Sequence, residues 1–135
     1  MDFPLDMHKN AFKASIAGLC ARDQGKFWEM NDMLFNNPTN NPTWLERVNL
    51  LKLAGGLGLD MTTFKKCLDG GKHDGEITQR IAEGQSKAGI TGTPAFLLGY
   101  MTSDGKVKAV KKMVGASPYA TFKAAIDEVL SSKKR

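Results

Sequence analysis

The chain has 135 residues, of which 41% are hydrophobic and 24% are charged, a composition typical of a globular protein. Its length predicts one domain, and no apolar run approaches the roughly 20 residues that span a bilayer, so we expect no membrane span. The net charge is +5, but the basic residues late in the chain lie in and after a predicted hairpin and at the chain end rather than on one face, so we expect a solvated surface and no nucleic-acid partner.

Two helices are predicted near the beginning of the chain. The first covers residues 8–21 and ends at residues 23–25, and the second follows at once. Apolar residues recur three or four positions apart in both, as on one face of a helix. These residues are Phe12, Ile16 and Leu19, then Phe27, Met30 and Leu34. Residues 36–42 read as a loop because they hold two prolines and four asparagines.

The middle of the chain predicts a third and a fourth helix. Residues 43–46, T-W-L-E, match a capping box, and Gly55 and Gly56 are expected to end the helix that it starts. Asp60 then caps a short helix, which Gly70 and Gly71 end. The expected apolar faces consist of Trp44, Val48 and Leu51 in the third helix and Phe64, Cys67 and Leu68 in the fourth.

A fifth helix and a β unit complete the predicted order. Ile77, Ile81, Gly84 and Ala88 define the helix, and Gly89 closes it. Residues 95–98 form a continuous apolar run, which suits a strand covered on both faces. Residues 103–105 give a turn signal, residues 106–110 alternate like a second strand, and Ser117-Pro118 starts a last helix. The stripe of that helix is Tyr119, Phe122, Ile126 and Val129.

The chemistry-bearing residues are few. The only cysteines, Cys20 and Cys67, form no C-x-x-C, and neither has metal-ligand spacing to His8 or His73. We therefore expect no zinc site and no cofactor, and we expect both histidines at the surface. A catalytic single cysteine is disfavoured because neither cysteine follows a glycine-rich turn or has a histidine near it in sequence.

Four segments, taken in order, resemble one known family. Residues 89–96, G-I-T-G-T-P-A-F, resemble the loop before the third core strand of thioredoxin-fold proteins, in the form G-[IV]-x-G-T-P-x-F of the DsbA-like thiol–disulfide oxidoreductases. Residues 20–28 and 59–71 resemble the helical insertion of that family, and residues 2–5 resemble the exit of the strand before the insertion. The departure is the missing C-x-x-C, because exchange needs a low-pKa thiolate and a resolving cysteine.

The resemblance implies a fold and a substrate-side site. The fold class is α/β: an incomplete thioredoxin-like fold in a single domain, residues 1–135, with a helical insertion at 8–89 and a loop, β-hairpin and terminal helix at 90–131. It also implies a cis Thr93–Pro94 bond. Gly92, Thr93 and Pro94 would then contact an extended thiol- or disulfide-containing polypeptide, with no catalytic residue in the chain.

The two cysteines leave alternatives open beside that resemblance. They suit two buried thiols, because both lie on apolar helix faces. They also suit a structural disulfide, because some DsbA-like proteins carry an extra pair in the insertion and an exported parent would be oxidised. We expect an extracytoplasmic location for the parent protein, although the beginning of this chain has no signal-peptide pattern.

Three functions are compatible with the sequence. The first is a part of an oxidoreductase that is inactive alone. The second is a non-catalytic module that binds extended peptides or oligomerises, since an apolar strand with an open edge favours a homodimer. The third is a relative that uses the fold with glutathione, as kappa-class glutathione transferases do. Trp28 and Trp44 are expected in the core rather than in a ligand site.

Overall fold

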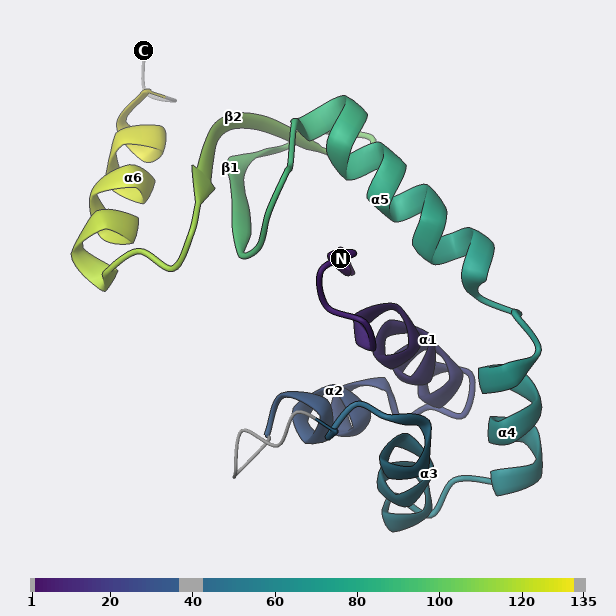
Figure 1. Cartoon of the computed structure of the whole chain (residues 1–135). Coiled ribbons are helices and arrows are strands. Elements are labelled where there is room, and N and C mark those ends of the chain that lie inside the picture. Colours follow the sequence, from purple (N-terminus) through teal and green to yellow (C-terminus); the bar gives the residue numbers. More distant parts are fainter. Residues whose placement is uncertain (1, 37–42, 133–135) are drawn as a thin grey trace. The chain divides into compact units, whose positions relative to one another are not determined.

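The computed structural model describes residues 2–36 and 43–132, and these divide into two compact units, residues 1–88 and 89–135. The described residues form six helices and one two-stranded antiparallel sheet, so the predicted α/β order of helices, hairpin and last helix is confirmed (Figure 1). The predicted loop at residues 36–42 lies, apart from Asn36, outside the described residues. Within them, no helix is long and apolar enough to cross a membrane.

The first unit is a helical assembly around α1 (Ala11–Arg22), which contacts each of the other four helices. Those helices are α2 (Phe27–Phe35), α3 (Arg47–Gly56), α4 (Met61–Asp69) and α5 (Asp74–Ala88). The largest fully buried side chain is that of Phe64, at 0% exposure. Around it the core draws on all five helices: Ile16, Leu19, Met30, Leu50, Leu53, Leu68 and Ile77.

The boundaries of α1, α4 and α5 follow local sequence signals. The predicted start of the first helix at residue 8 is three residues early, since residues 8–10 form turns. Asp60 caps α4 as expected, with its Oδ1 accepting from the backbone N–H of Thr63 at 2.7 Å. Gly89 ends α5 in the left-handed region, at φ +58°, where a glycine has no Cβ penalty.

The prediction for the third helix is wrong in two respects. Residues 43–46 form a turn, in which the N–H of Glu46 donates to the carbonyl of Thr43 at 2.9 Å, and the helix begins at Arg47 without a side-chain cap. The helix also runs through Gly55-Gly56, and the left-handed residue beyond it is Gly58, at φ +71°.

The buried face of α3 also differs from the expected one. Val48 is 55% exposed, whereas Leu50, Leu53 and Ala54 are buried. Arg47 forms a bidentate pair with Asp69 of α4, at 2.9 and 2.6 Å, which ties the first turn of α3 to α4. Contact with α1 and α4 therefore decides which side of α3 is buried, and a cap motif does not.

The second unit is a hairpin covered on one face by a helix. Strand β1 (Ala95–Met101) pairs antiparallel with β2 (Val107–Val114), and α6 (Tyr119–Ser132) follows. A bulge interrupts the ladder between Leu98 and Gly99, where a Cβ on Gly99 would lie 2.1 Å from a backbone oxygen of β2. Glycine is therefore required at this position.

Contacts between side chains show which face of the sheet α6 covers. The rings of Phe96 and Phe122 meet edge to face at 4.7 Å, and the Tyr100 hydroxyl donates to the carbonyl of Val129. Because side chains alternate along a strand, residues 97 and 101 lie on the opposite face. Leu97 is 42% and Met101 is 69% exposed, so the prediction of a strand covered on both faces is wrong for the described residues.

Candidate functional site

The loop before β1 is the first candidate site, and its two ends are fixed within the second unit. At its start, Lys112 Nζ donates to the carbonyl of Gly89 at 2.9 Å. At its end, the carbonyl of Pro94 accepts from the N–H of Gly115 at 2.8 Å, one step beyond the last pair of the β ladder. Both anchors tie the loop to β2 or to the residue that follows it.

The three predicted substrate-side residues lie together in this loop. The peptide bond between Thr93 and Pro94 is cis. Thr93 and Pro94 are exposed, and Gly92 is half-buried. A Cβ built on Gly92 would meet nothing within 4 Å, so the described chain itself leaves room there. The loop is thus accessible, and its residues 89–94 include no cysteine, histidine, lysine or carboxylate.

The edge of β1 beyond this loop is open. In an antiparallel pair, residues alternate between facing the partner strand and facing away from it. The carbonyl of Pro94 accepts from Gly115, so the backbone N–H and C=O groups of Phe96 and Leu98 point towards β2. Those of Ala95 and Leu97 point to the other edge of the strand. Among the described residues the sheet has two strands, so no third strand uses those groups. An extended polypeptide could pair with them.

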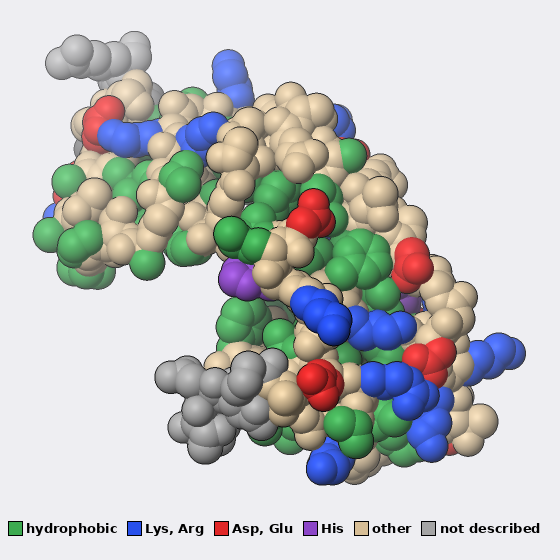
Figure 2. All heavy atoms as spheres, in the orientation of Figure 1, with side chains coloured by type: hydrophobic (Ala, Val, Ile, Leu, Met, Phe, Trp, Pro, Cys, Tyr) green, Lys and Arg blue, Asp and Glu red, His purple; other side chains and the backbone are tan. Residues whose placement is uncertain are grey.

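The exposed apolar surface of the second unit adjoins this edge. On the face away from α6, Leu97 and Met101 are joined by Val107, which pairs with Met101 and is 56% exposed. Figure 2 shows hydrophobic side chains gathered at the surface over α6 and the hairpin. On the other face, an open groove of about 650 Å³ lies between β2 and α6. It is lined by residues that include Lys111, Met113, Ala124 and Glu128.

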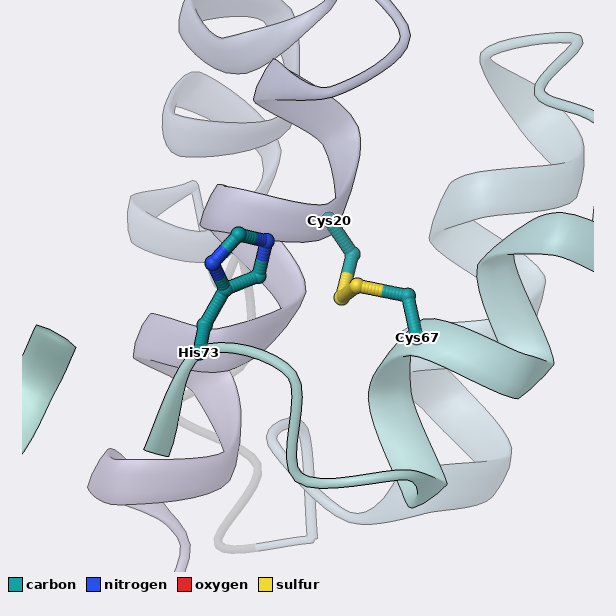
Figure 3. A group of neighbouring side chains, drawn as sticks. All are labelled: Cys20, Cys67 and His73. Carbon is teal, nitrogen blue, oxygen red and sulfur yellow. A yellow bond between two sulfur atoms is a disulfide. The ribbon is translucent and has the colours of Figure 1, made fainter. Parts of the chain in front are cut away.

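The cysteines form the second candidate site, in the first unit. Cys20 of α1 and Cys67 of α4 form a disulfide, with Cα atoms 5.9 Å apart (Figure 3). Of the two alternatives that the sequence left open, the structural disulfide is therefore confirmed. Both residues are buried, at 1% and 7% exposure. The disulfide links α1 covalently to α4.

The prediction for His73 is wrong, while His8 is exposed as expected. His73 lies just before α5 and is only 5% exposed. Its Nε2 lies 2.8 Å from Oδ2 of Asp23, the C-cap of α1, and its Nδ1 lies 3.4 Å from Oε2 of Glu76. Sequence reasoning missed this contact because 50 residues separate His73 from Asp23. No local signal in the sequence marks this contact.

The carboxylates around His73 are held in their charged form. Burial acts to raise the pKa of Asp23, but hydrogen bonds from Lys72 and His73 outweigh it, so this pKa lies below its usual value. The bidentate hydrogen bonds from Arg22, 2.9 Å each, lower the pKa of Glu76 to about 2 despite partial burial. Arg80 adds a second cation to Glu76. The result is an ion-pair network that joins α1 to α5.

The two tryptophans correct a further expectation. Trp28 is 72% exposed and contacts the ring of Phe27, so it is not a core residue. Trp44 is half-buried against the core, and its Nε1 donates to the carbonyl of Met33 at 3.2 Å. Of the two tryptophans, Trp44 contributes to the packing of the first unit and Trp28 does not.

Comparison with known proteins gives one consistent fold. A family model described as "DSBA-like thioredoxin domain" matches residues 1–127. The crystal structure of Wolbachia pipientis alpha-DsbA1 aligns with a TM-score of 0.71 at 22% identity, over 91% of this chain and 63% of that chain. A single-substitution variant of the same protein aligns with the same TM-score at 21% identity. At these identities the structures show the fold alone.

Two curated relatives share part of the sequence. They are the Na(+)/H(+) antiporter NhaA 3 of Salinispora tropica, 32% identical over 93 residues, and NhaA 1 of Salinispora arenicola, 35% identical over 96 residues. Each match covers 69% of this chain and 14% of the relative. The chain thus spans about one seventh of the length of those relatives.

Proposed function

Because this chain belongs to the DSBA-like thioredoxin domain family, we propose that it supplies the substrate-contacting part of a protein thiol–disulfide oxidoreductase. The sulfurs that react would come from a C-x-x-C on another stretch of polypeptide. The chain itself has only Cys20 and Cys67, which are already joined to each other and buried. Alone, it is therefore expected to be inactive in disulfide exchange.

The open edge of β1 carries this proposal. Ala95 and Leu97 direct backbone donors and acceptors away from β2, and the exposed residues Thr93 and Pro94 precede them directly. An extended substrate strand would satisfy those backbone groups, and the exposed loop beside them would contact the substrate near its sulfur. The proposed substrates are extended segments of other proteins that contain a thiol or a disulfide. The proposed reaction uses no cofactor.

An extracytoplasmic location is part of the proposal. The disulfide in the core of the first unit supports this location, because disulfides persist in oxidising compartments and reducing compartments keep thiols free. The family relationship points in the same direction.

The test restores the missing sulfurs. The chain alone should not reduce insulin, whereas joining it to the C-x-x-C segment of a DsbA-like protein should give turnover. In that fusion, Leu97→Pro should raise KM for insulin several-fold while leaving reduction of a small aromatic disulfide unchanged. Among backbone donors, proline removes the outward N–H of Leu97 and none that bonds to β2, so the ladder to β2 is kept. Equal insulin kinetics for the two fusions would contradict the proposal.

A second function, self-association, is supported by the exposed apolar face. Leu97, Met101 and Val107 are each more than two-fifths exposed beside an open strand edge, and such an edge recruits another strand. A homodimer that joins two β1 edges would cover them without any redox role. Light scattering should then report a dimer that Leu97→Lys dissociates. A compact monomer at high concentration would exclude this candidate, and activity of the C-x-x-C fusion would favour the first.

A further inference from the structure

Three side chains with metal-binding chemistry converge in the first unit. Cys20 comes from α1, Cys67 from α4, and His73 from the residue just before α5 (Figure 3). One donor atom from each lies within 4.8 Å of the others, and all three residues are buried. In sequence the three positions are too far apart to suggest a site, and the fold brings them together.

A fourth donor borders the cluster. Oδ2 of Asp23 lies 2.8 Å from His73 Nε2 and 4.0 Å from Cys67 Sγ. The ammonium of Lys72 lies 2.7 Å from the same oxygen, so a cation balances part of the negative charge. Two sulfurs, one imidazole and one carboxylate form a donor set that suits Zn²⁺.

The spacing is close to what a tetrahedral ion needs. Zinc bonds of about 2.3 Å to sulfur and about 2.0–2.1 Å to nitrogen put neighbouring donor atoms about 3.5–3.8 Å apart. The three donors already fall within 4.8 Å of one another. The two sulfurs must separate, and breaking the disulfide releases them to do so. His73 Nε2 and Asp23 Oδ2, which lie 2.8 Å apart, must also move to about 3.3 Å. The Cα separation of 5.9 Å can remain as it is.

We propose that Cys20, Cys67, His73 and Asp23 form a redox-gated zinc site, which binds Zn²⁺ only when the disulfide is reduced. A dithiol reductant donates two electrons and two protons, the S–S bond breaks, two thiols form, and the reductant becomes a disulfide. Zn²⁺ then displaces both thiol protons to solvent and bonds to the two thiolates. In the oxidised chain the sulfurs are bonded to each other, so metal and disulfide exclude one another.

The surroundings support a role for the imidazole as a ligand. Glu76 Oε2 lies 3.4 Å from His73 Nδ1, and Arg22 holds that carboxylate by two hydrogen bonds. A carboxylate on the second ring nitrogen orients a metal-binding histidine and raises its basicity. The consequence is that zinc would keep α1, α4 and the beginning of α5 joined when the disulfide is open.

Cobalt is the probe that tests this site. The full chain is reduced with dithiothreitol, freed of it by desalting without oxygen, and titrated with Co²⁺. We expect one Co²⁺ per chain, with the visible bands of a tetrahedral ion and a thiolate charge-transfer band that Zn²⁺ abolishes. The oxidised chain should show none of them. Absence of these bands in the reduced chain would overturn the proposal.

Substitutions distinguish a site that includes His73 from metal binding by the two cysteine thiols alone. His73→Gln should weaken Co²⁺ binding at least about tenfold, and Glu76→Gln by about tenfold through loss of ring orientation. The matched control His8→Gln, at an exposed histidine outside the cluster, should bind as the unaltered chain does. Equal affinity for His73→Gln and the unaltered chain would show that His73 is not a ligand and would refute the site.

A second measurement covers the case in which the reduced chain loses structure. Helical circular dichroism is followed while Zn²⁺ is added to the reduced chain and to its Cys67→Ala variant. Recovery of helix in the former but not in the latter supports the site. If Zn²⁺ restores no helix to a reduced chain that has lost it, the proposal fails.

Discussion

The two units of the chain differ in how far each can bury its own apolar surface. In the first unit the helices enclose a continuous core, and a disulfide and ion pairs tie them together. Among the residues that the structure describes in the second unit, 89–132, Ala125 and Val129 are the buried hydrophobic ones. Most of the exposed large hydrophobic side chains belong to the hairpin and α6. The first unit therefore buries an apolar core of its own, whereas the second leaves most of its large apolar side chains exposed.

The largest contrast should come from one phenylalanine in each unit. Phe64 is 0% exposed, so Phe64→Ala should lower the free energy of unfolding by about 3–5 kcal/mol. Phe96 is 39% exposed and meets Phe122 edge to face, so Phe96→Ala should cost less, about 1 kcal/mol. Urea unfolding measures both. Equal losses would mean that the two units are equally well packed.

Removal of the disulfide should weaken the first unit by less. Cys20 and Cys67 are 47 positions apart, and opening a loop of this size by Cys20→Ala with Cys67→Ala should cost about 2–4 kcal/mol. Hydrogen exchange should show the loss in the amides of α1 and α4. The amides of β2 serve as the control, and a matching loss there would contradict the separation into two units.

The ion-pair network predicts a pH dependence that is confined to the first unit. The pKa of Glu76 is about 2 in the folded chain against an ordinary value of 4.5, so the unfolded chain binds a proton first as the pH falls. The stability that Glu76 contributes is complete above about pH 5 and is lost as the pH falls towards 2. Because its side chain is a third exposed, solvent screening limits this contribution to about 1 kcal/mol.

A pair of substitutions checks that pH dependence. Glu76→Gln should remove about 1 kcal/mol at pH 7 and flatten the stability profile between pH 5 and pH 2. Glu128→Gln, which removes the 68% exposed partner of Lys111 in the second unit, should change stability little at any pH. A profile that Glu76→Gln leaves unaltered would show that another group titrates.

The smallest effect should come from Trp28. Its side chain is 72% exposed, so Trp28→Ala should change the unfolding free energy by no more than about 0.5 kcal/mol. Trp44→Ala should cost more, because Trp44 is half-buried and donates to the Met33 carbonyl. Thermal unfolding of both variants gives the comparison. A larger loss for Trp28 would mean that another surface covers it.

Local signals in the sequence predicted part of this structure. Asp60 and Gly89 mark helix boundaries correctly because a cap or a left-handed residue acts within a few positions. The T-W-L-E motif failed because contacts with α4 set the start of α3. A cap contributes only about 1 kcal/mol, which several tertiary contacts together exceed.

The two candidate sites also differ in how far local sequence signals could locate them. Gly92, Thr93 and Pro94 are adjacent in sequence, so one motif located the loop. The cluster of Cys20, Cys67, His73 and Asp23 joins three elements across about 50 positions, and no periodicity or spacing rule reports such a contact. His73 was therefore expected at the surface, although it is buried.

The central claim is that the second unit offers an open strand edge to another polypeptide, and residue-resolved hydrogen exchange across β1 tests it most directly. The amides of Phe96 and Leu98, which face β2, should exchange slowly. Those of Ala95 and Leu97 should exchange almost freely and become protected when an extended cysteine-containing peptide is added. Equal protection of all four amides in the isolated monomer, unchanged by the peptide, would contradict the claim.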